Sequence, residues 1–145
     1  MEGLIFQIIV FVILFSVGWG FGRYNESKHL KELAEQEQQL AYISMDTNKF
    51  AESPHIGMMI SSNVVLSHDY FKYVLASIQN FFGGRLKSYE SITERARREA
   101  IVRLKQQAQV LGAEHIMGVR LSTTELGMQG GMVEVFAYAT AVKKR

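Results

Sequence analysis

The chain has 145 residues, of which 48% are hydrophobic, and it carries a formal net charge of +2 and no cysteine. This length allows one domain of ordinary size with a short appendage. The absence of cysteine excludes disulfides, thiolate zinc sites, iron–sulfur clusters and a cysteine nucleophile. The small net charge does not by itself indicate a nucleic-acid-binding surface.

The most apolar segment lies at the N-terminus. Between Leu4 and Gly22, fourteen of nineteen residues are large and apolar. A helix of that length rises about 29 Å, close to the roughly 30 Å of a bilayer's hydrocarbon core. A cleaved signal peptide would need basic residues before the apolar run, and the three residues there include none. The sequence therefore predicts an uncleaved transmembrane anchor over residues 1–23.

The charges that flank this anchor predict its orientation. Arg23, Lys28 and Lys31 follow the apolar run, and no Lys or Arg precedes it. Basic residues close to a membrane helix favour the cytoplasmic side, and Trp19 and Tyr24 suit the membrane–water interface. We therefore expect a single-pass protein of the inner membrane, with its N-terminus outside and its soluble domain in the cytoplasm.

Residues 24–42 predict a juxtamembrane helix. Asn25 is a plausible N-cap, and the following residues are strong helix formers without Gly or Pro. Three leucines at heptad-like positions, with Glu37 interrupting them, form a narrow apolar stripe: Leu30, Leu33 and Leu40. Such a stripe fits either a short parallel coiled coil between copies of the chain or a solvated spacer, and the pattern leaves both open.

Residues 43–145 predict a small soluble domain. Four segments have the composition and alternation of strands: Ser44–Lys49, Ile56–Leu66, His115–Thr123 and Met132–Lys143. The last two flank a glycine-containing loop and predict an antiparallel hairpin. Because the final strand is apolar on both faces, it is predicted to be central in the sheet or covered on one face by another subunit.

Two segments between these strands have helical periodicity. The first spans about residues 69–82 and is followed by two glycines. The second is predicted to begin at Ser91, which forms a capping box with Glu94, and to end at Leu111 with Gly112 just beyond it. The resulting order, β-β-α-α-β-β, predicts a compact α+β layer fold.

The two faces of the second helix differ in chemistry. One carries small residues that imply close packing against a sheet or helix: Ala96, Ala100 and Ala108. The other carries mixed charges: Glu94, Arg95, Arg97, Arg98, Glu99, Arg103 and Lys105. We interpret the charged face as solvated, with contacts to subunits, anionic lipid or nucleic acid as alternatives.

Several separated motifs carry a family resemblance. In order they are Phe82-Gly83-Gly84-Arg85, Ser88-Tyr89-Glu90, Ala108-x-x-Leu111-Gly112-Ala113, Ile116-Met117-Gly118-Val119 and Tyr138-Ala139-Thr140-Ala141-Val142-Lys143. From about Ile43 onward the chain resembles the YbjQ-like family, which carries a heavy-metal-binding label. The resemblance implies a small α+β domain that forms a homopentameric ring, with metal or selenium-compound binding proposed for some members.

The chain departs from this family pattern in two places. It adds about forty residues of membrane and spacer helix before the domain. It also carries Ser62 and Ser67 where the family often has glycine, which weakens the case for a ligand loop there.

The glycine–arginine motif is the main candidate for a ligand site. Gly83 and Gly84 allow close backbone approach, and Arg85 offers a bidentate fork to an anion. Together with Tyr89 and Glu90 they would line a ligand or inter-subunit site. The motif lacks the Lys-Ser/Thr pair of a phosphate-binding loop, so a tight turn between two helices is the alternative.

A metal site would have to come from histidines and carboxylates. No two of the four histidines have the spacing of paired metal ligands on one helix or strand. A ring could still bring copies of His68 and Asp69 together at its axis, and we retain these two as metal candidates. No other cofactor is expected.

The sequence predicts that the protein is not an enzyme, because it shows no nucleophile beside a base and no differentiated carboxylate pair. It predicts instead a membrane-anchored, pentameric cytoplasmic binding or scaffold protein. The alternative is a metal or small-anion sensor with a site at the ring axis or subunit interface. The expected partners are further copies of the chain and the lipid bilayer, and nucleic acid is not expected.

Overall fold

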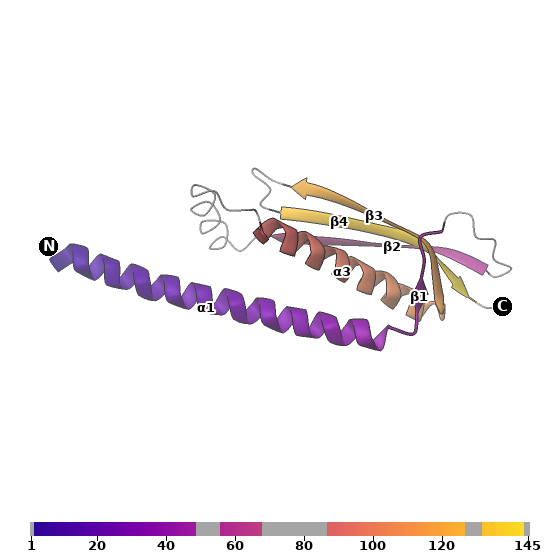
Figure 1. The fold of residues 1–145 in the computed structure, drawn as a ribbon, viewed down its shortest axis with the longest axis horizontal. Coiled ribbons are helices and arrows are strands. Elements are labelled where there is room, and N and C mark those ends of the chain that lie inside the picture. Colours follow the sequence, from indigo (N-terminus) through magenta and orange to yellow (C-terminus); the bar gives the residue numbers. More distant parts are fainter. Residues whose placement is uncertain (1, 49–55, 68–86, 127–131, 144–145) are drawn as a thin grey trace.

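The computed structural model describes residues 2–48, 56–67, 87–126 and 132–143, and its elements form three layers. In Figure 1 a sheet lies above helix α3, and the long helix α1 runs along the far side of α3. The elements are α1 (Glu2–Gln39), β1 (Ser44–Met45), β2 (Ile56–Ser67), α3 (Lys87–Val110), β3 (His115–Leu126) and β4 (Met132–Lys143). The predicted helix at 69–82 lies outside the described residues.

The sheet is mixed and has the order β1-β3-β4-β2. β4 pairs antiparallel with both β3 and β2, whereas the short β1 pairs parallel with β3. The α+β class, the hairpin and the central position of the last strand are therefore confirmed. Gly118 has a φ of 65° at the bulge in β3, a conformation that glycine adopts without strain.

β1 is shorter than the predicted strand over Ser44–Lys49. Only its first two residues pair, in register with His115 and Ile116. The carboxylate of Asp46 accepts a hydrogen bond of 2.9 Å from the backbone N–H of Asn48, an Asx turn that draws the chain away from the sheet. The prediction of a longer strand was wrong because alternation alone does not reveal this turn.

The core lies between α3 and the sheet. Ala96, Ala100, Leu104 and Ala108 are fully buried on the helix, and the alternate residues of β4 are buried opposite them. Ser62, itself buried in β2, donates a hydrogen bond of 2.8 Å to the carbonyl of Ala100. The alanines let the helix backbone lie close to the sheet, so the predicted close packing is confirmed.

α3 ends as predicted but begins earlier. Gly112 has a φ of 68°, its N–H bonds the carbonyl of Gln109, and the N–H of Ala113 bonds the carbonyl of Ala108, which is a Schellman motif. The helix starts at Lys87, however, so Ser91 lies inside it and the predicted capping box is wrong. Residues 87–90 contain no Gly or Pro, so nothing prevents the helix from including them.

α1 is one uninterrupted helix. Asn25, the predicted N-cap, lies within it, because residues 23–39 contain neither glycine nor proline to break the helix that begins in the apolar segment. The two predicted helices are thus continuous, and no break in the backbone marks the boundary between residues 1–23 and 24–42. The domain boundaries themselves stay predictions.

The C-terminal half of α1 packs on α3. Leu33 and Leu40 are only 3% exposed and belong to the main core, whereas Leu30 lies at the edge. Neither sequence-based alternative describes these two leucines, since they face α3 of the same chain instead of a second copy or solvent. This contact fixes the direction in which the N-terminal half of α1 leaves the domain.

The charged face of α3 provides polar contacts to α1. Arg98 forms a bidentate pair with Glu37, the Nζ of Lys105 donates to the carbonyl of Leu40, and His29 lies 3.3 Å from Glu99. The interpretation of this face as solvated was therefore wrong for its middle part. A mixed-charge face also suits a helix that packs against a polar helix.

Breaking the Glu37–Arg98 pair is expected to loosen α1 from α3. The hydrogen bonds from Arg98, at 2.8 and 2.6 Å, lower the pKa of Glu37. Because both side chains are about a third exposed, a double-mutant cycle of Glu37→Ala and Arg98→Ala should give a coupling of about 0.2–1 kcal/mol in urea unfolding. Because the pKa of Glu37 is lower in the folded state than in the unfolded state, its ionised carboxylate stabilises the fold at neutral pH. This contribution should disappear as the pH falls through the folded-state pKa of Glu37.

The matched control is Glu35→Ala, which removes an exposed glutamate from the same helix. Its coupling with Arg98→Ala should be close to zero. A Glu37–Arg98 coupling that persists at acid pH would contradict this assignment.

Candidate functional site

Most of the residues predicted to form a ligand site fall where the structure gives no side chains. Gly83, Gly84 and Arg85 lie outside the described residues, as do His68 and Asp69. Tyr89 and Glu90 belong to the first turn of α3, but their side chains are not described. The structure therefore does not show whether these groups come together, and the sensor alternative stays a prediction.

The described residues do not supply a metal centre. Within residues 2–48, 56–67, 87–126 and 132–143, no three His, Asp or Glu side chains come close enough to hold an ion. The donor set here does not fit a resident metal.

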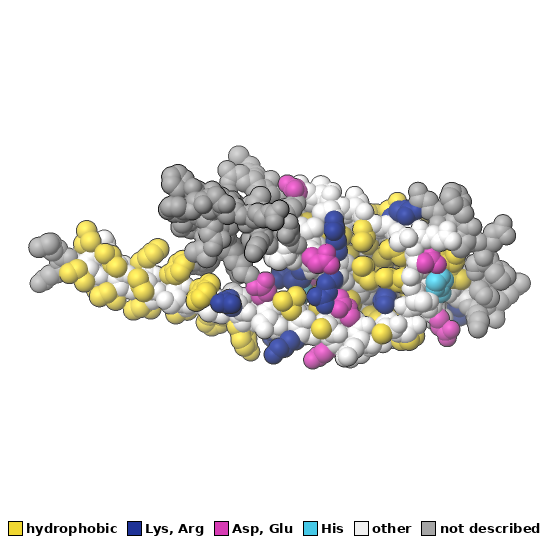
Figure 2. All heavy atoms as spheres, viewed as in Figure 1, with side chains coloured by type: hydrophobic (Ala, Val, Ile, Leu, Met, Phe, Trp, Pro, Cys, Tyr) yellow, Lys and Arg dark blue, Asp and Glu magenta, His cyan; other side chains and the backbone are white. Residues whose placement is uncertain are grey.

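The N-terminal half of α1 forms a large exposed apolar surface. By length and composition, α1 is the helix among the described residues that could cross a membrane, and none of its apolar window is buried. Figure 2 shows hydrophobic side chains around this part of the helix and charged ones gathered farther along, where α1 meets α3. The hydroxyl of Ser16 in this apolar segment donates a hydrogen bond of 2.7 Å to the carbonyl of Val12. Arg23 lies over the ring of Trp19 at 5.1 Å.

The face of the sheet opposite α3 forms a second exposed apolar surface, which we call the open face. Five of its side chains are large, apolar and at least 39% exposed: Met59, Val65, Met132, Phe136 and Tyr138. They share one face because Met59 and Val65 pair with Thr140 and Glu134, which alternate with the buried residues of β4. The rings of Phe136 and Tyr138 lie 5.8 Å apart. Adjacent exposed apolar side chains of this kind are typical of a protein contact site.

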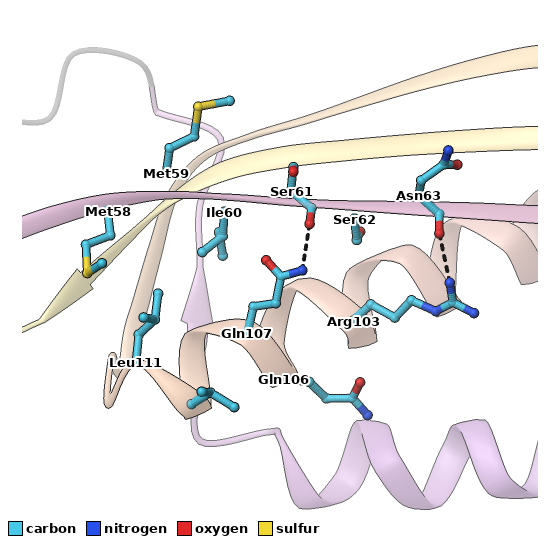
Figure 3. Close-up of a pocket in the computed structure, with 11 residues that line it drawn as sticks. Met58, Met59, Ile60, Ser61, Ser62, Asn63, Arg103, Gln106, Gln107 and Leu111 are labelled. Carbon is cyan, nitrogen blue, oxygen red and sulfur yellow. Dashed lines mark hydrogen bonds between the residues drawn. The ribbon is translucent and has the colours of Figure 1, made fainter.

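A groove of about 670 Å³ runs between β2 and α3. Figure 3 shows Gln107 and Arg103 reaching from α3 to β2, where they donate to the carbonyls of Ser61 and Asn63 at 2.7 and 2.8 Å. β2 is an edge strand, so these carbonyls would otherwise be open to a further strand. The side chains of α3 thus block strand addition along this stretch of the edge.

A polar cluster at the β1–β3 contact was missed from the sequence. The Oγ of Ser44 lies 2.6 Å from Nδ1 of His115, and Nε2 of that ring lies 3.1 Å from Oδ2 of Asp46. The hydrogen bond from Asn48 N–H holds the pKa of the Asp46 carboxyl below its ordinary value, and His115 contributes to this shift. The sequence did not place this serine hydroxyl beside an imidazole, and the expectation that the protein is not an enzyme stays a prediction. The only sequence signal was that both segments were predicted as strands.

Comparisons with known proteins agree on one family. The model of the YbjQ_1 family, described as "Putative heavy-metal-binding", matches residues 42–145. Among similar curated proteins, a "UPF0145 protein" of Hahella chejuensis is 38% identical over 61% of this chain and 82% of its own length. Another, from Bifidobacterium longum, is 39% identical over 59% of this chain and 77% of its own length.

A solved structure is also similar in part. It is the crystal structure of a protein of unknown function from Pediococcus pentosaceus, assigned to the DUF74 family. It is 17% identical, covers 72% of this chain and 99% of its own, and has a TM-score of 0.39. The family match over residues 42–145, together with the two UPF0145 proteins, shows that the chain belongs to the YbjQ family, whose function is uncharacterised.

Proposed function

We propose that the protein is a membrane-anchored homo-oligomer, built of five copies, whose YbjQ domain acts as a binding or scaffold module at the cytoplasmic face of the inner membrane. The ring would collect five anchors on one side, so that each domain stands at a fixed distance from the bilayer.

One observation carries this proposal. The two halves of α1 lie in opposite environments although the helix is continuous. The C-terminal half is held on α3 by Leu33, Leu40 and Glu37, whereas none of the apolar window in the N-terminal half is buried. An apolar helix surface of this size is not stable in water. A bilayer would cover it, and the rigid continuation onto α3 would hold the domain at the membrane surface.

The details of the first helix support this placement. The hydroxyl of Ser16 is satisfied within the helix, as a bilayer requires. Arg23 and Trp19 contact each other at the end of the apolar run, where an interface would lie. Arg23, Lys28 and Lys31 all follow that run, which favours a cytoplasmic domain and an external N-terminus.

The open face supports self-association. A central strand with exposed Phe136 and Tyr138 on one face, and buried side chains on the other, resembles half of a protein contact. None of the five open-face residues is charged. The carboxylate of Glu134, which lies beside them, accepts a hydrogen bond of 2.7 Å from the side-chain amide of Asn63. A second copy of the chain is the occupant that the family resemblance predicts, and such a contact would repeat around a ring.

Phe136→Glu is expected to dissociate the oligomer. Placing a carboxylate at the centre of an apolar contact leaves a desolvated charge without a partner. The measurement is the mass of the detergent-solubilised protein by light scattering, which should correspond to five copies for the parent chain and fewer for the variant.

The control is Val110→Glu, which introduces the same charge at an exposed position on α3 and should keep the parent mass. A parent chain that is monomeric at micromolar concentration would refute the proposed assembly, whatever the variants do.

A further inference from the structure

We propose that Ser44 is an activated nucleophile, with His115 as its base, and that it accepts acyl groups from small activated esters. The site lies where β1 meets β3, at the edge of the sheet and away from the membrane-directed half of α1. It makes no use of the residues on which the proposed scaffold function rests.

The proposal starts from the connectivity of the cluster. Ser44 and His115 are direct partners in the β1–β3 register, although they are 71 residues apart in the chain. Asp46 lies two residues after Ser44, and its backbone N–H bonds the carbonyl of Ile116 while its carbonyl accepts from Val119. Backbone pairing therefore holds all three side chains. Nucleophilic catalysis uses this pattern: a nucleophile, a base beside it and a third group that orients the base.

The carboxylate of Asp46 decides which nitrogen of His115 carries the proton. An ionised carboxylate only accepts hydrogen bonds, so the neutral ring must present its N–H at Nε2 toward Asp46. Nδ1 is then a bare acceptor, 2.6 Å from the hydroxyl of Ser44. The competing acceptor, the carbonyl of Glu114, lies farther away at 3.4 Å. The serine proton therefore points at the imidazole.

Asp46 is itself anchored. Its Oδ1 accepts from the N–H of Asn48 at 2.9 Å, and this hydrogen bond is the main reason that the pKa of the carboxyl lies below its ordinary value. Asp46 is thus a positioning residue, fixing the tautomer and the ring plane of His115.

The chemistry balances without a further reactant. Ser44 Oγ attacks the ester carbonyl carbon as its proton passes to Nδ1 of His115, and the bond from that carbon to the leaving oxygen then breaks. The leaving alkoxide takes the proton from His115 and departs as an alcohol, leaving an acyl ester on Ser44. Ser44 is exposed, and His115 and Asp46 are 37% and 39% exposed, so a small ester can reach the hydroxyl.

The test uses the full chain in detergent with p-nitrophenyl acetate. The expected result is a burst of about one nitrophenol per chain, with the acetyl group on Ser44 by peptide mass spectrometry. Ser27, an exposed serine on α1 beyond the apolar run, is the internal standard, and Ser44 should acetylate roughly 100-fold faster, the usual contribution of a general base.

The variants separate chemistry from folding. Ser44→Ala should abolish the burst, and Ser27→Ala should keep it. His115→Ala should slow acetylation of Ser44 to the rate of Ser27. Added imidazole should then accelerate acetylation of Ser44 more than that of Ser27, a difference that an unfolded chain would not show. Asp46→Asn should slow it as well, because an amide N–H favours the opposite tautomer. Acetylation of Ser44 no faster than of Ser27, or an unchanged rate in His115→Ala, would overturn the proposal.

Discussion

Deleting residues 2–22 is expected to move the protein from the membrane fraction to the soluble fraction. The deleted segment holds the fourteen large apolar residues of the exposed half of α1. At about 1.5–3 kcal/mol for each side chain removed from water, their insertion in a bilayer is favourable by roughly 20 kcal/mol or more. The measurement is fractionation with alkaline extraction, in which the parent chain should stay with the membranes.

The shortened chain should keep its fold, because residues 25–39 are held on α3 by Leu33, Leu40 and the Glu37–Arg98 pair. Circular dichroism of the soluble product tests this expectation and separates loss of the anchor from loss of structure. A parent chain released by alkali would refute the anchor, as would a shortened chain that remains bound. Protease added to sealed spheroplasts should leave the domain intact, and cleavage there would reverse the proposed orientation.

The elements that depend on local pattern could be predicted from the sequence. β2 and β4 alternate with period two along their length, and Gly112 stands where a helix must take a positive φ to end. Both features are determined by residues that are close together in the sequence. Capping residues are less reliable signals, since Asn25 and Ser91 have the right chemistry but lie inside longer helices.

The packing of α1 on α3 could not be predicted in the same way. Leu33 and Leu40 form a stripe too narrow to identify its partner, and that partner is the charged face of a helix some sixty residues later. A periodic pattern indicates that one face of a helix is buried, but it does not identify the element that buries it. Arg98 and Lys105 were predicted to be solvated for the same reason, since their sequence pattern does not identify α1 as the contacting element.

The cluster of Ser44, Asp46 and His115 could not be predicted from the sequence either. Its three side chains meet only because a parallel pair of two residues sets Ser44 opposite His115, and a strand so short has no sequence signature. Of the residues singled out from the sequence, Arg85 and its two glycines lie outside the described residues, and the side chains of Tyr89 and Glu90 are not described. The geometry therefore provided a different candidate from the one that motifs suggested.

Leu104→Ala is expected to destabilise the domain by about 2–5 kcal/mol. Leu104 is fully buried in the C-terminal part of α3, between alanines that bring the helix close to the sheet. Because Ala100 and Ala108 carry no side chain that could extend into the vacated space, the cavity should persist and the cost should fall in the upper part of this range. Urea unfolding of the full chain in mild detergent, followed by circular dichroism, measures the change.

Val110→Ala is the matched control, since Val110 lies on the same helix and is 87% exposed. Its effect should stay within about 0.5 kcal/mol, as for other surface positions. A loss from Leu104→Ala no larger than that would mean that α3 does not form the core against the sheet. A domain of this size has about 5–15 kcal/mol of stability in total, so the predicted loss would remove a large share. Because α1 is fastened to the other side of α3, it should also raise the proteolytic sensitivity of residues 25–39.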